Sequence, residues 1–379
     1  MKRLTAALLC AALLSGSAAA AEQPADAPQV EAKAAILMEQ ETGEVLCQQN
    51  AHDKLEPASV TKIMTLLLGM EAIDGGQLST GDTVTVSAHA ASMGGSQVYL
   101  KEGEQMTVDD LLKAVAVVSG NDAAVALAEH IAGSEEAFVS RMNQRAAELG
   151  MEDTTFLNCT GLPAAGHLTS AYDIALMSRA LLSHPDIRQY TTIWMDSIRG
   201  GQFQLSNTNR LVRFYPGCTG LKTGSTDSAG YCLSASAERD CLSLIAVVLG
   251  SETSAKRFTA AETLLNYGFA NYTLIDALAG QALPPVEVLL GAERWVQPVL
   301  QGSGKVVVRR SQLDSVTTEL RLAENVEAPV EQDQVLGEVT VLVNGQPLAS
   351  LPLTAQTAVE RLTIPGVFRR LLDHLFMAA

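Results

Sequence analysis

The chain has 379 residues, of which 47% are hydrophobic and 18% charged, and its formal net charge at pH 7 is −16. This length accommodates one large domain and one small domain. The negative charge argues against binding to nucleic acid, whose phosphates would repel the chain. No Gly-x-x-x-x-Gly-Lys loop that could cradle a nucleotide phosphate is present.

The first 21 residues have the three parts of a secretory signal. Lys2 and Arg3 form a positive start, an apolar run follows, and Ala19–Ala21 offers a small-residue cleavage site. The apolar run is too short to cross a bilayer, so we expect residues 1–21 to be removed and the chain to be exported. Residues 22–33 are rich in Ala, Pro and Gln and are predicted to be a linker.

An odd number of cysteines follows the signal, which leaves at least one of them unpaired in a monomer. The five are Cys47, Cys159, Cys218, Cys232 and Cys241. Neither Cys-x-x-Cys nor His-Glu-x-x-His spacing occurs, so we expect no metal site. The sequence leaves the pairing of the cysteines open.

A predicted hairpin at residues 35–47 is followed by a stretch that contains candidate catalytic residues. Here Pro57-Ala58-Ser59-Val60-Thr61-Lys62 leads into an apolar, helix-like segment, Ile63–Ile73. Ser59 and Lys62 are one helical turn apart, so their side chains point to nearly the same side. A serine is a poor nucleophile until a base takes its proton, and a lysine whose pKa is lowered can be that base. Taken alone, the pattern equally fits an ordinary capped helix start with a solvated lysine.

Three helices are predicted next, at residues 108–118, 123–131 and 135–149. Ser119-Gly120-Asn121 therefore lies in a tight connection between the first two helices. Such a corner would hold two short polar side chains in fixed positions.

A loop is predicted at residues 151–168, followed by another helix. Thr169 or Ser170 is expected to cap that helix. We assign His167, Thr169, Ser170 and Asp173 structural roles rather than catalytic ones.

Lys222-Thr223-Gly224 lies in a predicted strand. Further strands are expected at residues 231–237 and 242–249, with turns between them, and a helix at residues 253–269. Helices packed on such an antiparallel sheet make an α+β domain, which we place at residues 34–277.

Short strand-like runs and an Asn344-Gly345 turn predict a small all-β domain at residues 278–360. It contains no catalytic constellation, so we expect it to act as a stand. Residues 361–379 form a predicted amphipathic helix. Its segment 365–376 could contact a membrane surface or pack on its own β domain.

Together, Ser59-x-x-Lys62, Ser119-x-Asn121 and Lys222-Thr223-Gly224 form the signature of penicillin-binding proteins and class A β-lactamases. From about Ala34 to its end, the chain resembles the low-molecular-mass penicillin-binding proteins that act as serine-type D-alanyl-D-alanine carboxypeptidases. The resemblance implies a β-lactamase/transpeptidase-like fold for the α+β domain. It also implies an exported enzyme that is peripheral on the outer face of the cytoplasmic membrane.

The resemblance implies an activity without cofactor or metal. The enzyme would remove the terminal D-alanine from peptidoglycan stem pentapeptides through an acyl-enzyme on Ser59, which β-lactam antibiotics would also acylate. Lys62 would be the base, and Ser119 would relay a proton to the leaving amine. Asn121 would hold either Lys62 or the substrate amide.

The third signature would bind the substrate's terminal carboxylate. Lys222 would supply positive charge, Thr223 a hydrogen bond, and Gly224 would let the strand backbone come close to the substrate. The backbone N–H groups of Ser59 and Ser225 are expected to bind the oxyanion.

Two arginines match residues that the family places near the carboxylate pocket. These are Arg210 and Arg257, and the alternative for each is a solvated surface arginine. Some relatives carry a histidine or an aromatic residue where this chain has Ser225, so we expect its substrate affinity and deacylation rate to differ.

Two other functions fit part of this pattern. A β-lactamase would need a carboxylate to activate the deacylating water, but Glu152 is not followed by Asn at the required spacing. A non-catalytic scaffold would not need all three signatures intact. Release of D-alanine from a pentapeptide mimic separates the three possibilities.

Overall fold

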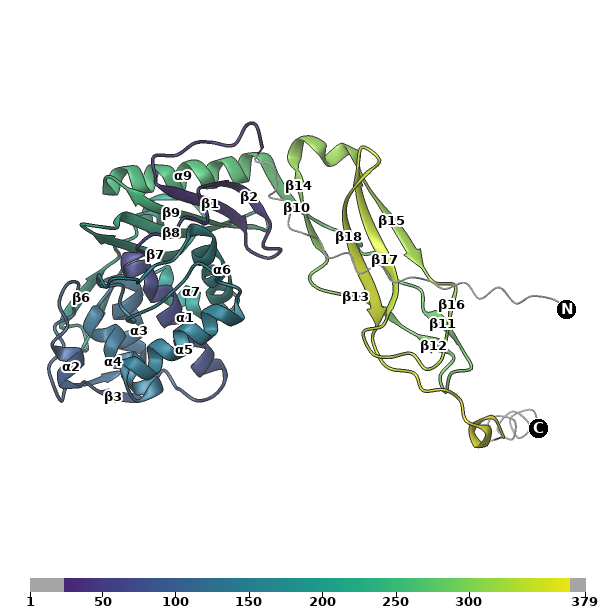
Figure 1. The fold of residues 1–379 in the computed structure, drawn as a ribbon, viewed down its shortest axis with the longest axis horizontal. Helices are drawn as coiled ribbons and strands as arrows, with labels where there is room; N and C mark the ends of the chain where they lie inside the picture. The colour runs from purple at the N-terminus through teal and green to yellow at the C-terminus, as the bar shows by residue number, and fades with distance from the viewer. Residues whose placement is uncertain (1–23, 369–379) are drawn as a thin grey trace.

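The computed structural model describes residues 24–368 in two units (Figure 1). The predicted signal at 1–21 and most of the predicted helix at 361–379 lie outside the described residues. The first unit is built on a five-stranded antiparallel sheet with the strand order β2-β1-β9-β8-β7. Its strands are β1 (Ala34–Glu39), β2 (Val45–Gln49), β7 (Cys218–Thr226), β8 (Gly230–Arg239) and β9 (Leu242–Ser251).

Alternating side chains of this sheet enter two separate cores, one on each face. On β1, Ile36 and Met38 join the large helical core, while Ala35 and Leu37 pack toward α9 (Ser254–Asn271). The helices on the larger side are α1 (Lys62–Asp74), α2 (Ala88–Ala91), α3 (Val108–Val117), α4 (Asn121–Ala132), α5 (Glu135–Glu148), α6 (Ala171–Leu182) and α7 (Arg188–Thr191). The α+β architecture predicted from the sequence is therefore confirmed.

Hydroxyl side chains define several helix starts. Thr107, Ser134 and Ser170 cap α3, α5 and α6, each accepting a hydrogen bond from a backbone N–H in the first turn. The prediction that Thr169 or Ser170 caps a helix is confirmed for Ser170. One boundary differs, because Asn121 is the first residue of α4 rather than part of the connection.

Several short elements were not predicted. They are η1 (Ala58–Thr61), β4 (Gln105–Thr107), η2 (Pro185–Ile187), β5 (Met195–Ile198), β6 (Phe203–Ser206) and α8 (Leu211–Phe214). A short strand is predicted at residues 84–86, and the structure has β3 at Thr83–Thr85. A loop is predicted at residues 87–98, but the structure has the short helix α2 within it. Elements of three or four residues are too short to show a hydrophobic period, which explains these differences.

The second unit consists of short antiparallel and parallel strands. They are β10 (Tyr272–Asp276), β11 (Val286–Leu289), β12 (Trp295–Val296), β13 (Pro298–Leu300), β14 (Lys305–Arg309), β15 (Val316–Leu322), β16 (Asn325–Glu327), β17 (Val335–Val343) and β18 (Gln346–Ala355), with η3 at Arg310–Ser315. The strand β10 pairs with β14, so β structure begins before the predicted boundary at residue 278. Because α9 passes directly into β10 without a loop, the sequence gives no boundary signal there.

The segment at residues 24–33 is more than a linker. Its Ala27, Val30 and Ala32 pack against the core beneath α9. The Asp26 carboxylate accepts hydrogen bonds from Arg309 of the second unit at 2.9 and 3.0 Å. The segment therefore connects both units, which its composition does not indicate.

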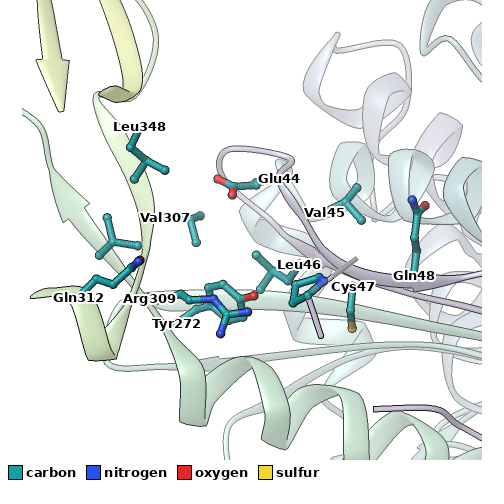
Figure 2. A pocket seen from close by; sticks show the side chains of 12 residues that line it. Glu44, Val45, Leu46, Cys47, Gln48, Tyr272, Val307, Arg309, Gln312 and Leu348 are labelled. Atoms are coloured by element: carbon teal, nitrogen blue, oxygen red, sulfur yellow. The ribbon is translucent and has the colours of Figure 1, made fainter. Parts of the chain in front are cut away.

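A pocket lies at the junction of the two units. Figure 2 shows Leu46 and Cys47 of β2 on one side and Val307, Gln312 and Leu348 of the second unit on the other. None of the predicted site residues lines it. Within residues 24–368, no helix has both the length and the apolar character that crossing a bilayer requires.

Candidate active site

Ser59 and Lys62 meet where η1 passes into α1. Lys62 is the first residue of α1, and its amine nitrogen lies 3.1 Å from Ser59 Oγ. The Lys62 side chain is fully buried, at 0% exposure. The structure therefore brings the two residues of the first signature into direct contact.

The Lys62 amine has two further partners. Its nitrogen lies 2.6 Å from Asn121 Oδ1 and 2.7 Å from the carbonyl oxygen of Thr160. A neutral amine has two N–H groups and one lone pair. When both N–H groups are donated to these oxygens, the lone pair faces the Ser59 hydroxyl and can accept its proton.

Burial tunes the charge of both lysines in the site. It lowers the pKa of Lys62 to about 7, with smaller raising effects from Cys159 and Asp122. Burial also holds the pKa of Lys222 well below its usual range, helped by the positive charges of Lys62 and Arg257. A positive charge on Lys62 therefore disfavours the charged form of Lys222.

Ser119 is held in an unusual state between α3 and α4. Its φ of +65° is in the left-handed region, which is uncommon for a residue with a side chain. It is 4% exposed, and among residues 24–368 its hydroxyl has no hydrogen-bond partner. A buried hydroxyl without a partner costs stability. Because no protein group uses its hydrogen-bonding capacity, the Ser119 hydroxyl is available to a bound molecule.

Both polar atoms of the Asn121 side chain form hydrogen bonds. Its Oδ1 accepts from Lys62, and its Nδ2 donates to the Gly94 carbonyl at 2.7 Å. Its backbone N–H donates to the Ser96 carbonyl at 2.7 Å. Of the two roles predicted for Asn121, the geometry favours holding Lys62.

The strand β7 brings the third signature against η1. A Cβ on Gly224 would lie 2.8 Å from the Ser59 nitrogen, so only glycine permits this approach. Lys222 Nζ donates to the Thr223 carbonyl at 2.9 Å, and Thr223 Oγ1 lies 2.7 Å from Thr208 Oγ1. Ser225 follows and is exposed.

A turn at residues 158–161 presents the Thr160 carbonyl to Lys62. Asn158 Oδ1 accepts hydrogen bonds from the backbone N–H groups of Thr160 and Gly161, at 3.2 and 2.7 Å. Gly161 has φ +81°, and a Cβ there would lie 1.8 Å from the Ala58 carbonyl oxygen. The turn therefore packs directly against the residue that precedes Ser59.

A buried histidine links the same loop to η1. His167 Nδ1 accepts a hydrogen bond from the Leu157 N–H at 3.1 Å, and its Nε2 lies 2.9 Å from Thr61 Oγ1. In the neutral ring the proton is then on Nε2, so Thr61 is free to donate to the Ala58 carbonyl, 2.9 Å away. Burial lowers the pKa of His167 to about 4, which keeps the ring neutral. These contacts agree with the structural role that we predicted for His167.

The two predicted arginines lie in different places. Arg257 is buried under the sheet, and its Nη1 donates to the carbonyls of Gly224 and Cys232 at 3.1 and 3.3 Å. Arg210 is exposed, and its guanidinium lies over the Phe214 ring at 5.9 Å. Among the described residues, the structure gives Arg210 no hydrogen bond to the other predicted site residues.

The sequence did not indicate the contributions of Thr61, Thr160 and Thr208. Thr160 acts through its backbone carbonyl, which every residue has, so no side-chain pattern could reveal it. The Asn158-x-x-Gly161 spacing, typical of a turn, was the available signal. In the part of the chain that the structure describes, no group of three or more His, Cys, Asp or Glu side chains could hold a metal ion.

Comparisons with known proteins extend over nearly the whole chain. Residues 19–253 match the family model described as D-alanyl-D-alanine carboxypeptidase, and residues 273–361 match the model of the penicillin-binding protein 5 C-terminal domain. D-alanyl-D-alanine carboxypeptidase DacF of Bacillus subtilis is 40% identical over 371 residues, which cover 95% of each chain. DacC of Escherichia coli is 37% identical over 96% of this chain and 92% of its own.

Solved structures of penicillin-binding proteins are also similar to this chain. Penicillin binding protein 5 from Haemophilus influenzae has a TM-score of 0.80 at 30% identity, over 89% of this chain and 100% of that chain. Penicillin-binding protein D2 from Listeria monocytogenes, solved with ampicillin bound, has a TM-score of 0.59 at 34% identity. The matched region covers 64% of this chain and 100% of the Listeria chain.

Proposed function

The chain belongs to the D-alanyl-D-alanine carboxypeptidase family and is a serine-type D-Ala-D-Ala carboxypeptidase that penicillin inhibits, and we propose that Ser59 is its nucleophile. The resemblance predicted from the three signatures is thereby confirmed. The assignment of Ser59 rests on one observation. The buried Lys62 amine, whose pKa is lowered, lies 3.1 Å from the Ser59 hydroxyl. Peptidoglycan peptides and β-lactams are the ligands expected of this family.

Acylation begins with the neutral form of Lys62. Ser59 Oγ attacks the carbonyl carbon of the penultimate D-alanine while its proton moves to the Lys62 amine. The tetrahedral intermediate then collapses and the C–N bond breaks. The leaving D-alanine amine receives, through the Ser119 hydroxyl, the proton that Lys62 took from Ser59, which returns Lys62 to its neutral form. Water adds to the resulting ester, Ser59 leaves as the alcohol, and the shortened peptide is released.

The substrate carboxylate is assigned to Lys222 and Thr223. An arriving carboxylate offsets the charge of Lys222, so the complex can hold this lysine protonated while Lys62 stays neutral. Thr223 and its partner Thr208 can donate hydrogen bonds to the same group. Arg257 acts from beneath the sheet through its charge and its bond to the Gly224 carbonyl, and Arg210 remains a candidate at the rim.

The oxyanion is assigned to the backbone N–H groups of Ser59 and Ser225. Two such donors typically contribute several kcal/mol to the transition state. Gly224 supports this pairing, because its missing side chain lets β7 approach the Ser59 nitrogen closely.

The test is mass spectrometry of the intact protein and its peptides after incubation with penicillin. We expect a stable adduct on the Ser59 peptide and none in Ser59→Ala. Lys62→Ala should lose acylation while its circular dichroism spectrum is unchanged. Acylation at the wild-type rate in Lys62→Ala would contradict the assignment of the base.

The same samples separate the alternative functions. A carboxypeptidase releases D-alanine from a pentapeptide mimic, whereas a scaffold releases none. A β-lactamase would clear penicillin rapidly and leave no lasting adduct.

We also infer that the protein is exported and peripheral on the outer face of the cytoplasmic membrane. The support is the signal-like sequence at residues 1–21 and the apolar positions of segment 365–376. Its described part exposes Val367 and Phe368 to 42% and 65%. Fractionation of cells that produce the full chain tests this inference, and recovery in the cytoplasm would contradict it.

A further inference from the structure

Exposed apolar side chains gather at the end of the second unit that is remote from the catalytic site. Six of the thirteen exposed large hydrophobic residues within residues 24–368 lie in two short segments there. The end of β11 provides Leu289, the turn after it Leu290 and the start of β12 Trp295, while residues 364–368 provide Ile364, Val367 and Phe368. We call these six residues the distal patch. Figure 1 shows β11 and β12 beside the C-terminal segment, at the opposite end from β7.

Backbone contacts hold the two segments together. The Leu362 N–H donates to the Leu290 carbonyl at 2.7 Å, and Gly291 forms an isolated antiparallel bridge with Arg361. The turn and the segment that leads into the C-terminal helix therefore lie side by side.

Leu290 is held at a backbone conformation that packing does not explain. Its φ is +59°, in the left-handed region that bulky residues rarely adopt, and its side chain is 57% exposed. A polar residue or glycine would fit an exposed turn of this kind better. A strained and exposed leucine is a candidate for a contact outside the folded unit itself.

We propose that the distal patch is a lipid-docking surface in which the β11–β12 turn enters the membrane interface beside the C-terminal segment. This inference rests on the proposed membrane association and adds a second element to it. It assigns Leu290 and Trp295, which no helix contains, to the contact with lipid.

The chemistry of the patch fits a bilayer better than a protein partner. Its side chains project outward, and tryptophan favours the level of the lipid headgroups. The nearby cations are already paired, Arg294 with Glu287 and Arg361 with Glu327, each at 3.1 Å. Apolar burial rather than charge therefore drives the contact, and binding should depend only weakly on salt.

The first experiment uses the two tryptophans of the chain, Trp194 and Trp295, in the protein from Glu22 onward. Trp194→Phe leaves Trp295 as the probe, and Trp295→Phe leaves Trp194 as the control. Each is mixed with vesicles of phosphatidylcholine and phosphatidylglycerol in equal parts, with or without bromine on the phosphatidylcholine acyl chains. We expect brominated lipid to quench Trp295 and to leave Trp194 unchanged.

The second experiment measures co-sedimentation with the same vesicles. Leu290→Ser with Trp295→Ser should lower the partition coefficient about tenfold, because two large apolar side chains no longer enter the interface. The matched control is Leu313→Ser with Leu348→Ser, which removes two exposed leucines outside the patch and should leave partitioning unchanged. Both variants should release D-alanine from a soluble peptide at the wild-type rate.

The failures are distinguishable. Full vesicle binding without quenching of Trp295, and without loss in the double variant, would overturn the role of the turn while leaving membrane association intact. Absence of binding to any vesicle would overturn both proposals and would point to a protein partner for the distal patch.

Discussion

Asn121 and Thr160 each accept one hydrogen bond from the Lys62 amine, which leaves its third position for Ser59. A protonated amine would donate to all three oxygens and could not take the Ser59 proton. The lowered pKa of Lys62 therefore decides what fraction of the enzyme can react.

The unpaired Ser119 hydroxyl predicts a separation of activity from stability. Ser119→Ala should lower kcat/KM for D-alanine release about a hundredfold, because a proton relay is lost. Its free energy of unfolding should be unchanged or slightly higher, because the hydroxyl has no partner to lose. Steady-state kinetics and urea unfolding of the same preparation measure both quantities.

Ser170→Ala is the matched control for that variant. Ser170 is also buried, but its hydroxyl caps α6 by accepting from the Asp173 N–H at 3.2 Å. We expect this change to cost about 1 kcal/mol of stability and little activity. If Ser119→Ala destabilised the protein as much as the control does and kept full activity, the relay assignment would be wrong.

At the scale of residues, the signatures located Ser59, Lys62 and Asn121, which the structure joins by hydrogen bonds. They also located Gly224, whose strand packs against Ser59. They could do so because spacing along a helix or strand fixes where side chains point. Thr160 acts through its carbonyl and Thr208 through a contact between distant segments, so neither leaves a local pattern. Arg210 was identified by its likeness to a family residue, but that likeness does not indicate which way its guanidinium points.

At the scale of elements, the turn at residues 158–161 and η1 fit together only through a glycine. Gly161→Ala would place a methyl group 1.8 Å from the Ala58 carbonyl oxygen. The resulting shift of Ser59 should slow penicillin acylation about a hundredfold, since misplacement by about 1 Å can have that effect. Stopped-flow measurement of acylation tests this expectation.

Gly166→Ala is the control for the cost of placing a side chain at a left-handed backbone conformation. Gly166 is in the same loop with φ +93°, but the nearest atom to an added Cβ is Leu157 Cδ1 at 3.8 Å. It should cost about 1 kcal/mol from the left-handed conformation alone and leave acylation nearly unchanged. Equal acylation rates in the two variants would show that the contact with Ala58 is unimportant.

The neutral His167 predicts a pH-dependent loss of stability. Its pKa is lowered from 6.5 to about 4 in the folded protein, so the unfolded chain binds the proton more readily. The stabilisation is complete above pH 6.5 and is lost as the pH falls toward 4, by up to about 3 kcal/mol. Urea unfolding of wild type and His167→Gln across this range should show their stability difference shrinking as the pH falls. A difference that stays constant would mean that His167 does not titrate in this window.

Long helices were predictable from the sequence, and short elements were not. Capping hydroxyls and apolar periods place both ends of α3 and α5 within one residue, and capping places the start of α6, because these signals are local. The hairpin of β5 and β6 has no such period. Its position depends on contacts such as Arg199 Nε to Glu104 Oε1 at 2.6 Å, which join distant parts of the chain.

At the scale of the whole molecule, the catalytic site and the distal patch lie at opposite ends (Figure 1). Attachment through the patch would therefore hold the site away from the lipid and toward the peptidoglycan. The net charge of −16 repels the chain as a whole from an anionic membrane, so apolar contact at the patch would supply the attraction. The sequence predicted two units, but the contact of residues 24–33 with both of them emerges only in three dimensions.

The pH dependence of acylation by penicillin tests the central claim most directly. The claim is that a neutral Lys62 removes the proton of Ser59. The second-order rate constant for adduct formation on Ser59 should rise with pH, reach half its maximum near pH 7 and then level off, because the neutral form of Lys62 predominates above its pKa. A rate that rises only near pH 10.5, or that does not vary with pH, would contradict the account.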